Sequence, residues 1–566
     1  MTTISHPVEH DELDRMIGEL EVGARAWAAT TLYDRAALMI RTHTTVRDAA
    51  QEWAQTALRI KKTPPSVAGE EWLAGPYITM ATLTETARTL ATLAAGRGPL
   101  DDVPITAAPG GRIALQLLPV GAQEKLLLNG FSGEVWMPPG TDAEQARAAA
   151  GLAARHPDRN GGVGLVLGAG NVTLIGPLDA IYQLVAYNRV SVLKLNPTFH
   201  DLLPVYQKAF APLIKRDLLR IINGASEIGA YITNHPDIAH VHITGSGATH
   251  DAIVWGTGPE AERRRTAHQP LLRTEITSEL GGVSPIIVVP GKWSAADLRY
   301  QAENVATQKL QNCGHNCIAG QAMIMSSSWP QAEEFLDAIR RVFDRLPPRE
   351  VWYPGSERRM AQAEHTYPRA ERHCGRLLVK VDDSTSDELF HTEYFSPVLG
   401  YTTLPGSGID FLRAAIGFAN ERLTGTLGAS ILVAPRDRRK MGPGFTEALA
   451  ELRYGTIGVN CWSATGYLAP ALPWGAFPGN AIDDVGSGIG FVHNTRLIAN
   501  PERVVVTGPF RPFPRSWFGG ESSMAPPLPY LVTSKANTSS AKALTHYAAH
   551  PGWGSIPQVF KSILAP

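Results

Sequence analysis

Cysteine is scarce in this chain of 566 residues. Only Cys313, Cys317, Cys374 and Cys461 occur, and so sparse a set does not resemble the disulfide framework of a small secreted domain. Residues 1–14 contain no basic segment followed by an apolar core, so we expect no secretory signal. A reduced, cytoplasmic setting is the prediction that fits both observations.

An excess of charge of one sign is also lacking. The chain has 52 lysines and arginines against 53 aspartates and glutamates, which leaves a formal net charge of −1. A chain with almost no net charge has no overall electrostatic field that would attract a polyanion, so we do not expect nucleic acid as a partner. The densest basic run, Arg263-Arg264-Arg265, stands beside Glu260 and Glu262 and indicates a solvated surface.

No hydrophobic run has the character of a membrane span. Residues 161–178 form the least charged stretch and are long enough to raise the question. Their glycines, together with Asn171, Thr173 and Pro177, favour a buried strand that runs into a loop. We therefore expect no membrane span.

The order of apolar patterns predicts several α/β units. The length suggests three or four domains. Residues 10–97 repeat apolar side chains at helical spacing, and residues 113–117 indicate a strand that Pro119 ends. Downstream, short apolar runs alternate with helical segments, which implies parallel sheets that bind ligands at the carboxyl ends of their strands. Strands are expected at residues 163–167, 190–195, 219–222, 240–244 and 284–289, and helices at 177–188, 203–214 and 295–310.

A cysteine between glycines is the most informative motif. Cys317 lies in Gly314-His-Asn-Cys-Ile-Ala-Gly320, downstream of Glu279 in Ser278-Glu-Leu-Gly-Gly282. A thiol that becomes acylated needs an independent base to bring water to the thioester. Alone, Cys317 would more often be a buried, inert thiol in a tight loop. Its pairing with Glu279 favours catalysis through an enzyme-bound thioester.

A metal site is an alternative for the same loop, because Cys313, His315 and Cys317 are close in sequence. Tetrahedral zinc normally takes four ligands in recognisable pairs, and no second Cys or His pair is evident. We therefore predict no metal.

Taken together, six motifs resemble the aldehyde dehydrogenase superfamily over about residues 20–510. Each is weak alone, but they occur in the order that the family has. They are Gly168-Ala-Gly-Asn171, Val192-Leu-Lys-Leu-Asn196, Ile243-Thr-Gly-Ser246, Ser278-Glu-Leu-Gly-Gly282, Gly314-His-Asn-Cys-Ile-Ala-Gly320 and Glu393-Tyr-Phe-Ser-Pro-Val398.

The resemblance implies catalytic roles for three residues. Cys317 matches the nucleophile, and the Asn171 amide matches a donor that stabilises the alkoxide together with the N–H of the nucleophile. Glu279 matches the base that activates water for deacylation. The implied reaction oxidises an aldehyde to a carboxylic acid with NAD or NADP, through a thiohemiacetal and a thioester.

The resemblance also implies contacts with the dinucleotide. Where NAD-preferring members often carry an acid, three residues after Lys194, this chain has Pro197. A 2′-phosphate would not be repelled there, so either NAD or NADP is expected. The residues that match cofactor contacts are Lys194, Gly224, Gly245, Ser246, Leu280, Glu393 and Phe395.

The expected fold class is α/β, with a Rossmann-like cofactor-binding domain, an α/β catalytic domain and a C-terminal extension. A homo-oligomer is expected from the family. Gly170 stands where members often have an aromatic, which widens the substrate channel or shifts the Asn171 loop. The expected bounds are 1–283 for the N-terminal helices and cofactor domain, 284–490 for the catalytic domain, 491–515 for an oligomerisation-type segment and 516–566 for an irregular extension that docks on the surface.

Two other functions compete. In an acyl-CoA reductase of the same superfamily, coenzyme A takes or gives the acyl group, and the Gly170-Asn171 pair has some likeness to that branch. A base such as Glu279 would hydrolyse the thioester that an acyl-CoA reductase must preserve, so its presence counts against this alternative. A catalytically silent scaffold is the other alternative, against which Cys317, Glu279 and Asn171 all count. The sequence does not identify the aldehyde.

Overall fold

The N-terminal part of the molecule is helical, as predicted. The computed structural model describes residues 9–564. Leu13, Ile17, Leu20, Ala24 and Trp27 form the buried stripe of the first helix, because residues three and four apart share one face. A π-helical turn with non-helical backbone interrupts the later helices. The elements are α1 (His10–Ala28), α2 (Leu32–Ile60), η1 (Pro65–Val67), α3 (Gly69–Trp72), η2 (Leu73–Tyr77) and α4 (Ile78–Ala94).

A six-stranded sheet follows, in the order β17-β8-β7-β4-β5-β6. All its pairs are parallel except that of β17. The predicted strands in this region are confirmed. The strands are β4 (Val163–Leu167), β5 (Val190–Lys194), β6 (Leu219–Ile222), β7 (Ile238–Gly245), β8 (Ile276–Leu280) and β17 (Gly488–Ile489), and the helices and turns are α7 (Ile175–Ala186), η4 (Pro197–Leu202), α8 (Leu203–Ala209), α9 (Ala211–Ile214), α10 (Ser226–Thr233), α11 (Gly247–Val254) and α12 (Gly258–Thr266).

The strand order of this sheet reverses beside β4. The chain moves from β4 to β5 and β6 on one side, and returns to β7 and β8 on the other. Ligands of open parallel sheets bind outside the carboxyl ends of the strands at such a switch point. The segment after β4, which contains Asn171, is therefore placed at the expected crevice.

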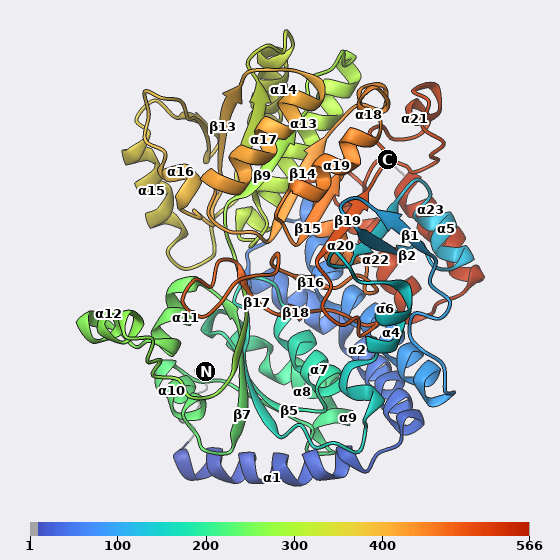
Figure 1. The fold of residues 1–566 in the computed structure, drawn as a ribbon, viewed down its shortest axis with the longest axis vertical. Coiled ribbons are helices and arrows are strands. Elements are labelled where there is room, and N and C mark those ends of the chain that lie inside the picture. The colour runs from blue at the N-terminus through green and yellow to red at the C-terminus, as the bar shows by residue number, and fades with distance from the viewer. Residues whose placement is uncertain (1–8, 565–566) are drawn as a thin grey trace.

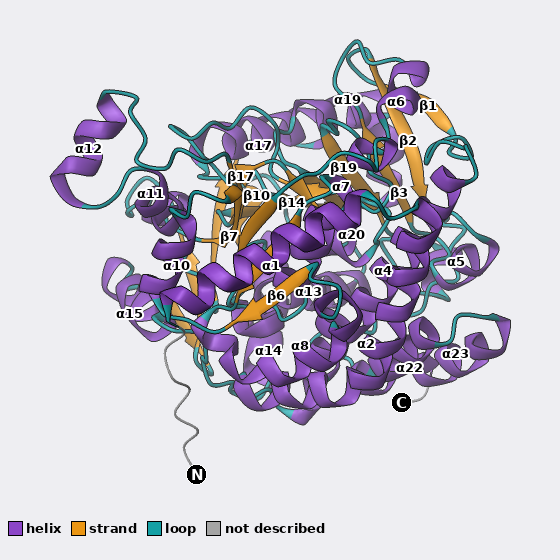
Figure 2. Cartoon of the chain, turned by 90° about the horizontal axis from the view of Figure 1, so that it is seen from below, coloured by secondary structure: helices purple, strands orange, loops and turns teal. Residues whose placement is uncertain are grey.

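A second, eleven-stranded sheet has the order β1-β2-β3-β19-β15-β14-β9-β10-β13-β12-β11, and its central strands are parallel. Figure 1 shows it above the first sheet, and Figure 2 shows helices around the strands. Its strands are β1 (Ile105–Ala108), β2 (Arg112–Leu118), β3 (Ser132–Trp136), β9 (Ser284–Val288), β10 (Gly320–Ser326), β11 (Glu371–His373), β12 (Arg376–Lys380), β13 (Val398–Leu404), β14 (Gly428–Leu432), β15 (Thr456–Val459) and β19 (Arg503–Thr507).

The remaining elements are helices, short turns and a separate two-stranded sheet formed by β16 and β18. The predicted helix at residues 295–310 is confirmed, and Ser294 caps its first turn. The elements are α5 (Ala122–Leu127), α6 (Ala143–Ala149), η3 (Leu152–Arg155), α13 (Ala295–Leu310), η5 (Gln311–Gly314), α14 (Ala332–Arg345), α15 (Ser356–Thr366), α16 (Glu388–His391), α17 (Gly408–Arg422), α18 (Pro435–Met441), α19 (Pro443–Glu451), α20 (Ala464–Leu468), β16 (Trp474–Gly475) and β18 (Phe491–Val492).

The two sheets do not divide the chain at one point. The strands β1, β2 and β3 lie within the range 1–283, yet they extend the second sheet, where β3 pairs with β19 in antiparallel fashion. Conversely, β17 returns from the C-terminal half to pair with β8. Long-range strand pairing is not visible in local apolar patterns, so the sequence does not indicate these exchanges.

The C-terminal extension, residues 516–566, is less irregular than predicted. It contains α21, which begins at Arg515 (Arg515–Phe518), α22 (Asn537–Ala549), η6 (Trp553–Ser555) and α23 (Ile556–Leu564). The prediction of irregular structure is therefore wrong for much of residues 537–564. The prediction that the extension docks holds, because His43 Nε2 lies 2.9 Å from the Ala548 carbonyl oxygen and Asn537 Oδ1 accepts from Gly69 N–H. Within residues 9–564, no helix combines the length and apolarity that a membrane crossing requires.

Candidate active site

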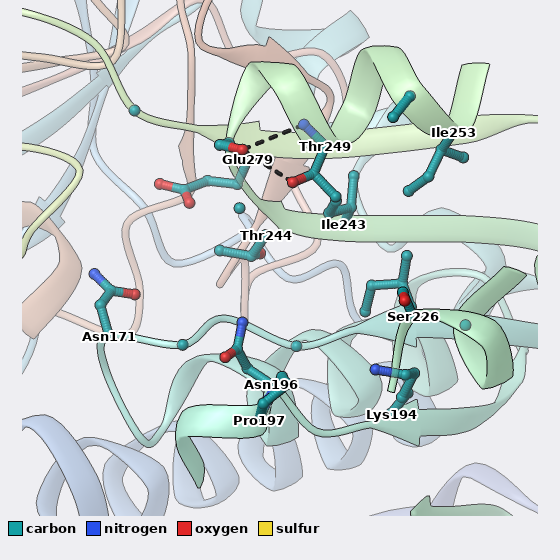
Figure 3. A pocket seen from close by; sticks show the side chains of 18 of the residues that line it. Asn171, Lys194, Asn196, Pro197, Ser226, Ile243, Thr244, Thr249, Ile253 and Glu279 are labelled. Atoms are coloured by element: carbon teal, nitrogen blue, oxygen red, sulfur yellow. Dashed lines mark hydrogen bonds between the residues drawn. The ribbon is translucent and has the colours of Figure 1, made fainter. Parts of the chain in front are cut away.

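A cavity of about 750 Å³ lies at the carboxyl ends of the six-stranded sheet. Segments that follow β4, β5, β7 and β8 line one side, and Figure 3 shows Asn171, Lys194, Thr244 and Glu279 around it. The second sheet contributes Cys317 and the segment before β13. A volume of this size suits a cofactor or a substrate of similar size.

The loop that carries Cys317 is built from unusual backbone. Asn312, Cys313 and Gly314 all have positive φ, at 53°, 57° and 77°, a region that glycine adopts readily and other residues seldom do. A Cβ on Gly314 would lie 2.7 Å from the Ser396 carbonyl carbon and oxygen. Only glycine fits there, and the turn brings Cys317 to the cavity just before β10.

Cys317 and Cys313 have different surroundings. Cys317 lines the cavity, whereas Cys313 is buried with Sγ 3.7 Å from the Glu350 carbonyl oxygen. Burial, followed by the charge and hydrogen bonding of Glu279, raises the pKa of the Cys317 thiol well above its usual value. The thiol is thus protonated at rest and adjoins a group that can take its proton.

Glu279 occupies the end of β8, with only 5% of its surface exposed. Trp474 Nε1 donates to its Oε1 over 3.0 Å. Burial raises the pKa of Glu279 to about 7, although hydrogen bonds from Trp474 and Cys317 act in the opposite direction. A carboxylate with this pKa can both accept and release a proton near neutral pH.

Asn171 is held against the cysteine loop. Its Nδ2 donates to the His315 carbonyl oxygen over 3.0 Å, and Asn312 Nδ2 donates to the Asn171 carbonyl oxygen over 2.9 Å. An amide NH₂ carries two donor hydrogens, so one is left to stabilise negative charge beside Cys317. The peptide N–H of Asn312 in turn donates to the buried Glu70.

Residue 170 must be glycine because Asn196, across the loop, lies too close for a side chain. A Cβ there would lie 2.6 Å from Asn196 Cγ, and Thr198 Oγ1 donates to the Gly170 carbonyl oxygen over 2.8 Å. The space that a side chain of residue 170 would take is thus filled by Asn196. This explains the sequence departure without a wider channel at that point.

The far end of the cavity carries one predicted cofactor residue, Lys194. It closes β5, lines the cavity and packs against α10, where a Cβ on Gly229 would lie 3.4 Å from Lys194 Cε. Burial lowers the pKa of Lys194. Pro197 and Ser226 line the same region, as Figure 3 shows.

Gly245 and Ser246 also line the cavity, between β7 and α11. The Ser246 side chain caps α11 by accepting from Thr249 N–H over 3.2 Å. The N-terminus of α11 therefore faces the cavity, and free N–H groups at such an end favour phosphate groups.

Glu393 and Phe395 approach from the second sheet and line the cavity. Burial raises the pKa of Glu393 to about 8 despite the nearby charge of Lys309. A Cβ on Gly281 would collide with Glu393 Oε1, and that oxygen has no hydrogen-bond partner among residues 9–564. A buried acceptor without a partner fits a ligand hydroxyl.

Two predicted cofactor residues do not line the cavity. Gly224 lies in the loop before α10, where a Cβ would approach Ile228 Cβ at 2.9 Å. Leu280 is buried, and its N–H donates to the Ser487 carbonyl oxygen over 2.9 Å. Leu280 stands between two lining residues, Glu279 and Gly281, and therefore supports the wall of the cavity.

Sequence reasoning misses the residues that hold the catalytic groups. Trp474 contacts Glu279 across 195 positions of sequence, and no local signal marks it. Asn312 lies two residues before the cysteine motif, and its positive φ of 53° is one that asparagine adopts more readily than most residues. The three side chains of the alternative metal site have separate surroundings: His315 Nε2, for example, lies 3.0 Å from Ser356 Oγ.

Comparison with known proteins shows similarity to aldehyde dehydrogenases. A model described as the aldehyde dehydrogenase family matches residues 161–351. An aldehyde dehydrogenase of Enchytraeus buchholzi is 32% identical over 126 residues, or 22% of this chain and 21% of that protein. An aminoacetaldehyde dehydrogenase of Pseudomonas aeruginosa is 27% identical over 258 residues, or 42% and 47%. The chain thus spans less than half the length of either curated relative.

Solved structures are similar over much more of the chain. An aldehyde dehydrogenase C mutant of Pseudomonas syringae, in complex with NAD+ and octanal, is 16% identical and aligns over 88% of each chain with a TM-score of 0.59. An NADP-dependent glyceraldehyde-3-phosphate dehydrogenase of Bacillus halodurans, in complex with NADP, is 17% identical over 88% and 92%, with a TM-score of 0.58. These similarities confirm the predicted fold class.

Proposed function

We infer that this chain belongs to the aldehyde dehydrogenase superfamily and that it oxidises an aldehyde to a carboxylic acid with NAD or NADP; the match over residues 161–351 and the shared fold support this. One observation carries this inference: Cys317, Glu279 and Asn171, which come from three separate segments, line a single cavity. A nucleophile, a base and an amide donor are the groups that thioester chemistry requires.

The cavity offers groups that fit a dinucleotide. The N-terminus of α11 suits its phosphates, and the unpartnered Glu393 Oε1 suits a ribose hydroxyl. Lys194 and Pro197 line the other end, and the described residues there include no carboxylate. A 2′-phosphate would meet a cation and no repelling acid, so we propose that NADP is accepted as well as NAD.

The first half of the reaction forms a covalent adduct. Glu279 takes the proton of the Cys317 thiol, and the thiolate attacks the aldehyde carbon to give a tetrahedral alkoxide. Asn171 Nδ2 and the Cys317 N–H donate to that oxygen. The nicotinamide, when bound, supplies the hydride acceptor, and loss of hydride from the carbon leaves an acyl thioester on Cys317.

The second half hydrolyses the thioester. Glu279 first releases the thiol proton to solvent. It then takes a proton from water as the water oxygen attacks the acyl carbon, and it passes that proton to the Cys317 sulfur as the C–S bond breaks and the carboxylic acid leaves. The pKa of Glu279, about 7, suits it to this work, and Trp474 holds the carboxylate in place.

Glu279→Gln tests the proposal. The amide keeps the shape of the carboxylate but cannot accept the proton, so the variant should form reduced cofactor in a burst of about one per site and then stall. Intact-protein mass should show an acyl adduct on Cys317. Glu279 also assists thiol deprotonation, which shrinks the burst, so the adduct is the firmer measurement.

Two outcomes would count against the proposal. Turnover of Glu279→Gln at the wild-type rate would remove Glu279 as the base. Release of the stalled enzyme by coenzyme A would favour the acyl-CoA reductase instead. The wild-type chain, given a panel of aldehydes with NAD and NADP in parallel, should reduce the cofactor; failure with the entire panel would favour a silent binding protein.

A further inference from the structure

Three aromatic side chains are exposed to solvent on one tight turn at residues 513–518. The exposed fractions are 47% for Phe513, 59% for Trp517 and 90% for Phe518. Pro514 between them is exposed as well. Scattered apolar residues on a surface need no explanation, but a group of large rings in contact with water marks a site of interaction.

The turn is fixed by hydrogen bonds, which hold these rings at the surface. Ser516 lies at its centre, is fully buried and donates from Oγ to the Ser523 carbonyl oxygen over 2.7 Å. The Ser516 N–H donates to the Pro512 carbonyl oxygen, and the Phe513 N–H donates to that of Ala525. Because Ser516 faces inward, the aromatic residues on either side of it face outward.

A basic pocket lies beside this turn, against α18. It has a volume of about 280 Å³, and the segment around the turn contributes Arg511 and Gly519 to its lining. A Cβ on Gly520 would lie 3.8 Å from the Arg439 guanidinium. Figure 1 shows α21, which carries the exposed rings of Trp517 and Phe518, at the periphery of the molecule near α18. The basic lining residues are Lys292, Arg436, Arg439, Lys440 and Arg511.

Much of the positive charge in this pocket is not neutralised. Asp437 also lines the pocket and pairs with Lys440 over 3.2 Å. Arg511 is neutralised by Asp297 and Glu521. The pocket therefore keeps three exposed cations that form no ion pair among residues 9–564. They are Lys292, Arg436 and Arg439.

Exposed rings beside free cations fit the surface of an anionic bilayer. Tryptophan and phenylalanine insert at the level of the lipid headgroups, while lysine and arginine attract the phosphates of anionic lipids. With 90% of its surface exposed, Phe518 has almost no protein around its ring. A ring that stands clear of the protein suits insertion into a fluid surface, whereas a ligand pocket would enclose its occupant.

A second copy of this chain is a less suitable occupant. In a symmetric dimer the same patch faces itself, so the three free cations of one copy would meet those of the other. Like charges placed together oppose association. A bilayer of anionic lipid supplies many negative charges and adapts its shape to the inserted side chains.

We propose that the turn at residues 513–518 and the neighbouring basic pocket dock this protein on the surface of an anionic lipid bilayer. Trp517 and Phe518 insert among the headgroups, and Arg436 and Arg439 contact the lipid phosphates. The protein lies on one side of the bilayer, and this mode of binding requires no helix that crosses it.

Co-sedimentation with lipid vesicles tests the proposal and needs no enzyme activity. The full chain should bind vesicles of equimolar phosphatidylglycerol and phosphatidylcholine. It should bind vesicles of phosphatidylcholine alone at least about tenfold more weakly, and salt should weaken binding to the mixed vesicles. Failure to bind the mixed vesicles would overturn the proposal.

Two double variants separate the apolar from the ionic contribution. Trp517→Ser with Phe518→Ser removes the inserted rings, and Arg436→Gln with Arg439→Gln removes two free cations. Each should weaken binding to the mixed vesicles about tenfold or more. All four side chains are exposed, so both variants should keep the wild-type Tm. Wild-type affinity in both variants would contradict the proposal.

The chain offers a matched control for each double variant. Trp553 has the same 59% exposure as Trp517 but lies before α23. Arg263 and Arg264 on α12 carry the same charge, and Glu260 pairs with both. Trp553→Ser, and Arg263→Gln with Arg264→Gln, should bind the mixed vesicles as the wild type does. Losses in these controls equal to those in the test variants would mean adsorption through the whole surface, and the assignment to this turn would be wrong.

Two further outcomes would assign the surface to another partner and overturn the proposal. The first is an oligomer, seen by analytical ultracentrifugation without lipid, that Trp517→Ser with Phe518→Ser dissociates; the turn would then bind a second copy. The second is displacement from the vesicles by inorganic phosphate at constant ionic strength, with full binding by the same double variant. The basic pocket would then be a site for free phosphate.

Discussion

Glu279 combines two properties that oppose each other. Its carboxylate is buried, which raises its pKa to about 7, yet hydrogen bonds from Trp474 and Cys317 favour the charged form and limit the rise. The opposing effects place the proton equilibrium near the pH at which most proteins work. When the pKa of a general base is close to the working pH, the product of its ionised fraction and its basicity is greatest.

The pH dependence of turnover should report this group. Protonated Glu279 cannot accept a proton, so kcat should fall about tenfold per pH unit below about 7 and level off above. Steady-state kcat from about pH 5.5 to about pH 9 measures it. Glu279→Gln should lose the inflection along with most of its activity; an inflection that persists in this variant belongs to another group.

The two neighbouring cysteines should differ in function. Cys317→Ala should abolish dehydrogenase turnover, because no thiol remains at the cavity to form the adduct. Cys313→Ala is the matched control and should keep a substantial fraction, since its thiol points to the Glu350 carbonyl oxygen. Initial rates of nicotinamide reduction measure both. Full activity in Cys317→Ala would remove the proposed nucleophile, and equal losses would leave no distinction between the two thiols.

At the scale of elements, the active site is a set of strand ends joined by short loops. Three residues, Gly281, Gly282 and Val283, connect β8 of one sheet to β9 of the other. This short connection brings Glu279 and the cysteine loop before β10 together. The loop itself depends on left-handed backbone at Asn312, Cys313 and Gly314.

Gly314→Ala should cost both stability and activity. A methyl group would collide with the Ser396 carbonyl at 2.7 Å, so the loop must move, and Cys317 with it. Gly375→Ala is the control, because Gly375 has a similar φ of 81° but open space around its Cβ position. The control should lose only the roughly 1–2 kcal/mol of left-handed strain. Thermal unfolding and kcat would test this; equal effects in the two variants would contradict it.

Some elements follow from local sequence, whereas others do not. The helix at residues 295–310 has a Ser294 cap and an apolar periodicity, and its predicted bounds agree with those observed. The helix Asn537–Ala549 escapes prediction, because the prolines upstream of it indicate an irregular tail. Its alanines Ala541, Ala543 and Ala548 are buried against other parts of the chain, which local composition does not reveal.

At the scale of the whole molecule, the C-terminal extension closes the structure against the N-terminal helices. Its helix α22 contacts α2 and α3, and α23 packs on α22. Figure 1 shows this extension in red beside α5. Helices from the two ends of the chain thus pack against each other. We expect the fold to depend on this contact for stability.

Truncation after Lys535 should lower the midpoint of thermal inactivation, because it removes α22 and α23 and exposes the apolar surface beneath them. Asn537→Ala is a milder variant that removes the acceptor of Gly69 N–H, and it should cost about 1–3 kcal/mol, the range for a buried donor left without a partner. Inactivation rates on heating measure both. If truncation leaves the midpoint unchanged, the extension does not stabilise the core.

The sequence by itself determined the α/β class, the strands β4, β5, β6 and β7 of the first sheet, and the chemical types at the active site. These features depend on short-range patterns: alternating strands and helices, and glycine-bounded motifs whose residues are adjacent. Cys317, Glu279, Asn171, Lys194, Glu393 and Phe395 each stand out through such a motif, and all of them line one cavity.

Only the tertiary structure decided which distant residues meet. The hydrogen bond from Trp474 to Glu279, the exchange of strands β1 to β3 and β17 between the sheets, and the contacts of the C-terminal extension with α2 and α3 all join segments far apart in the chain. Such contacts arise from the packing of whole elements, because buried polar atoms must form hydrogen bonds and apolar surfaces are stabilised by burial. The local sequence of one segment does not indicate which distant segment it will contact.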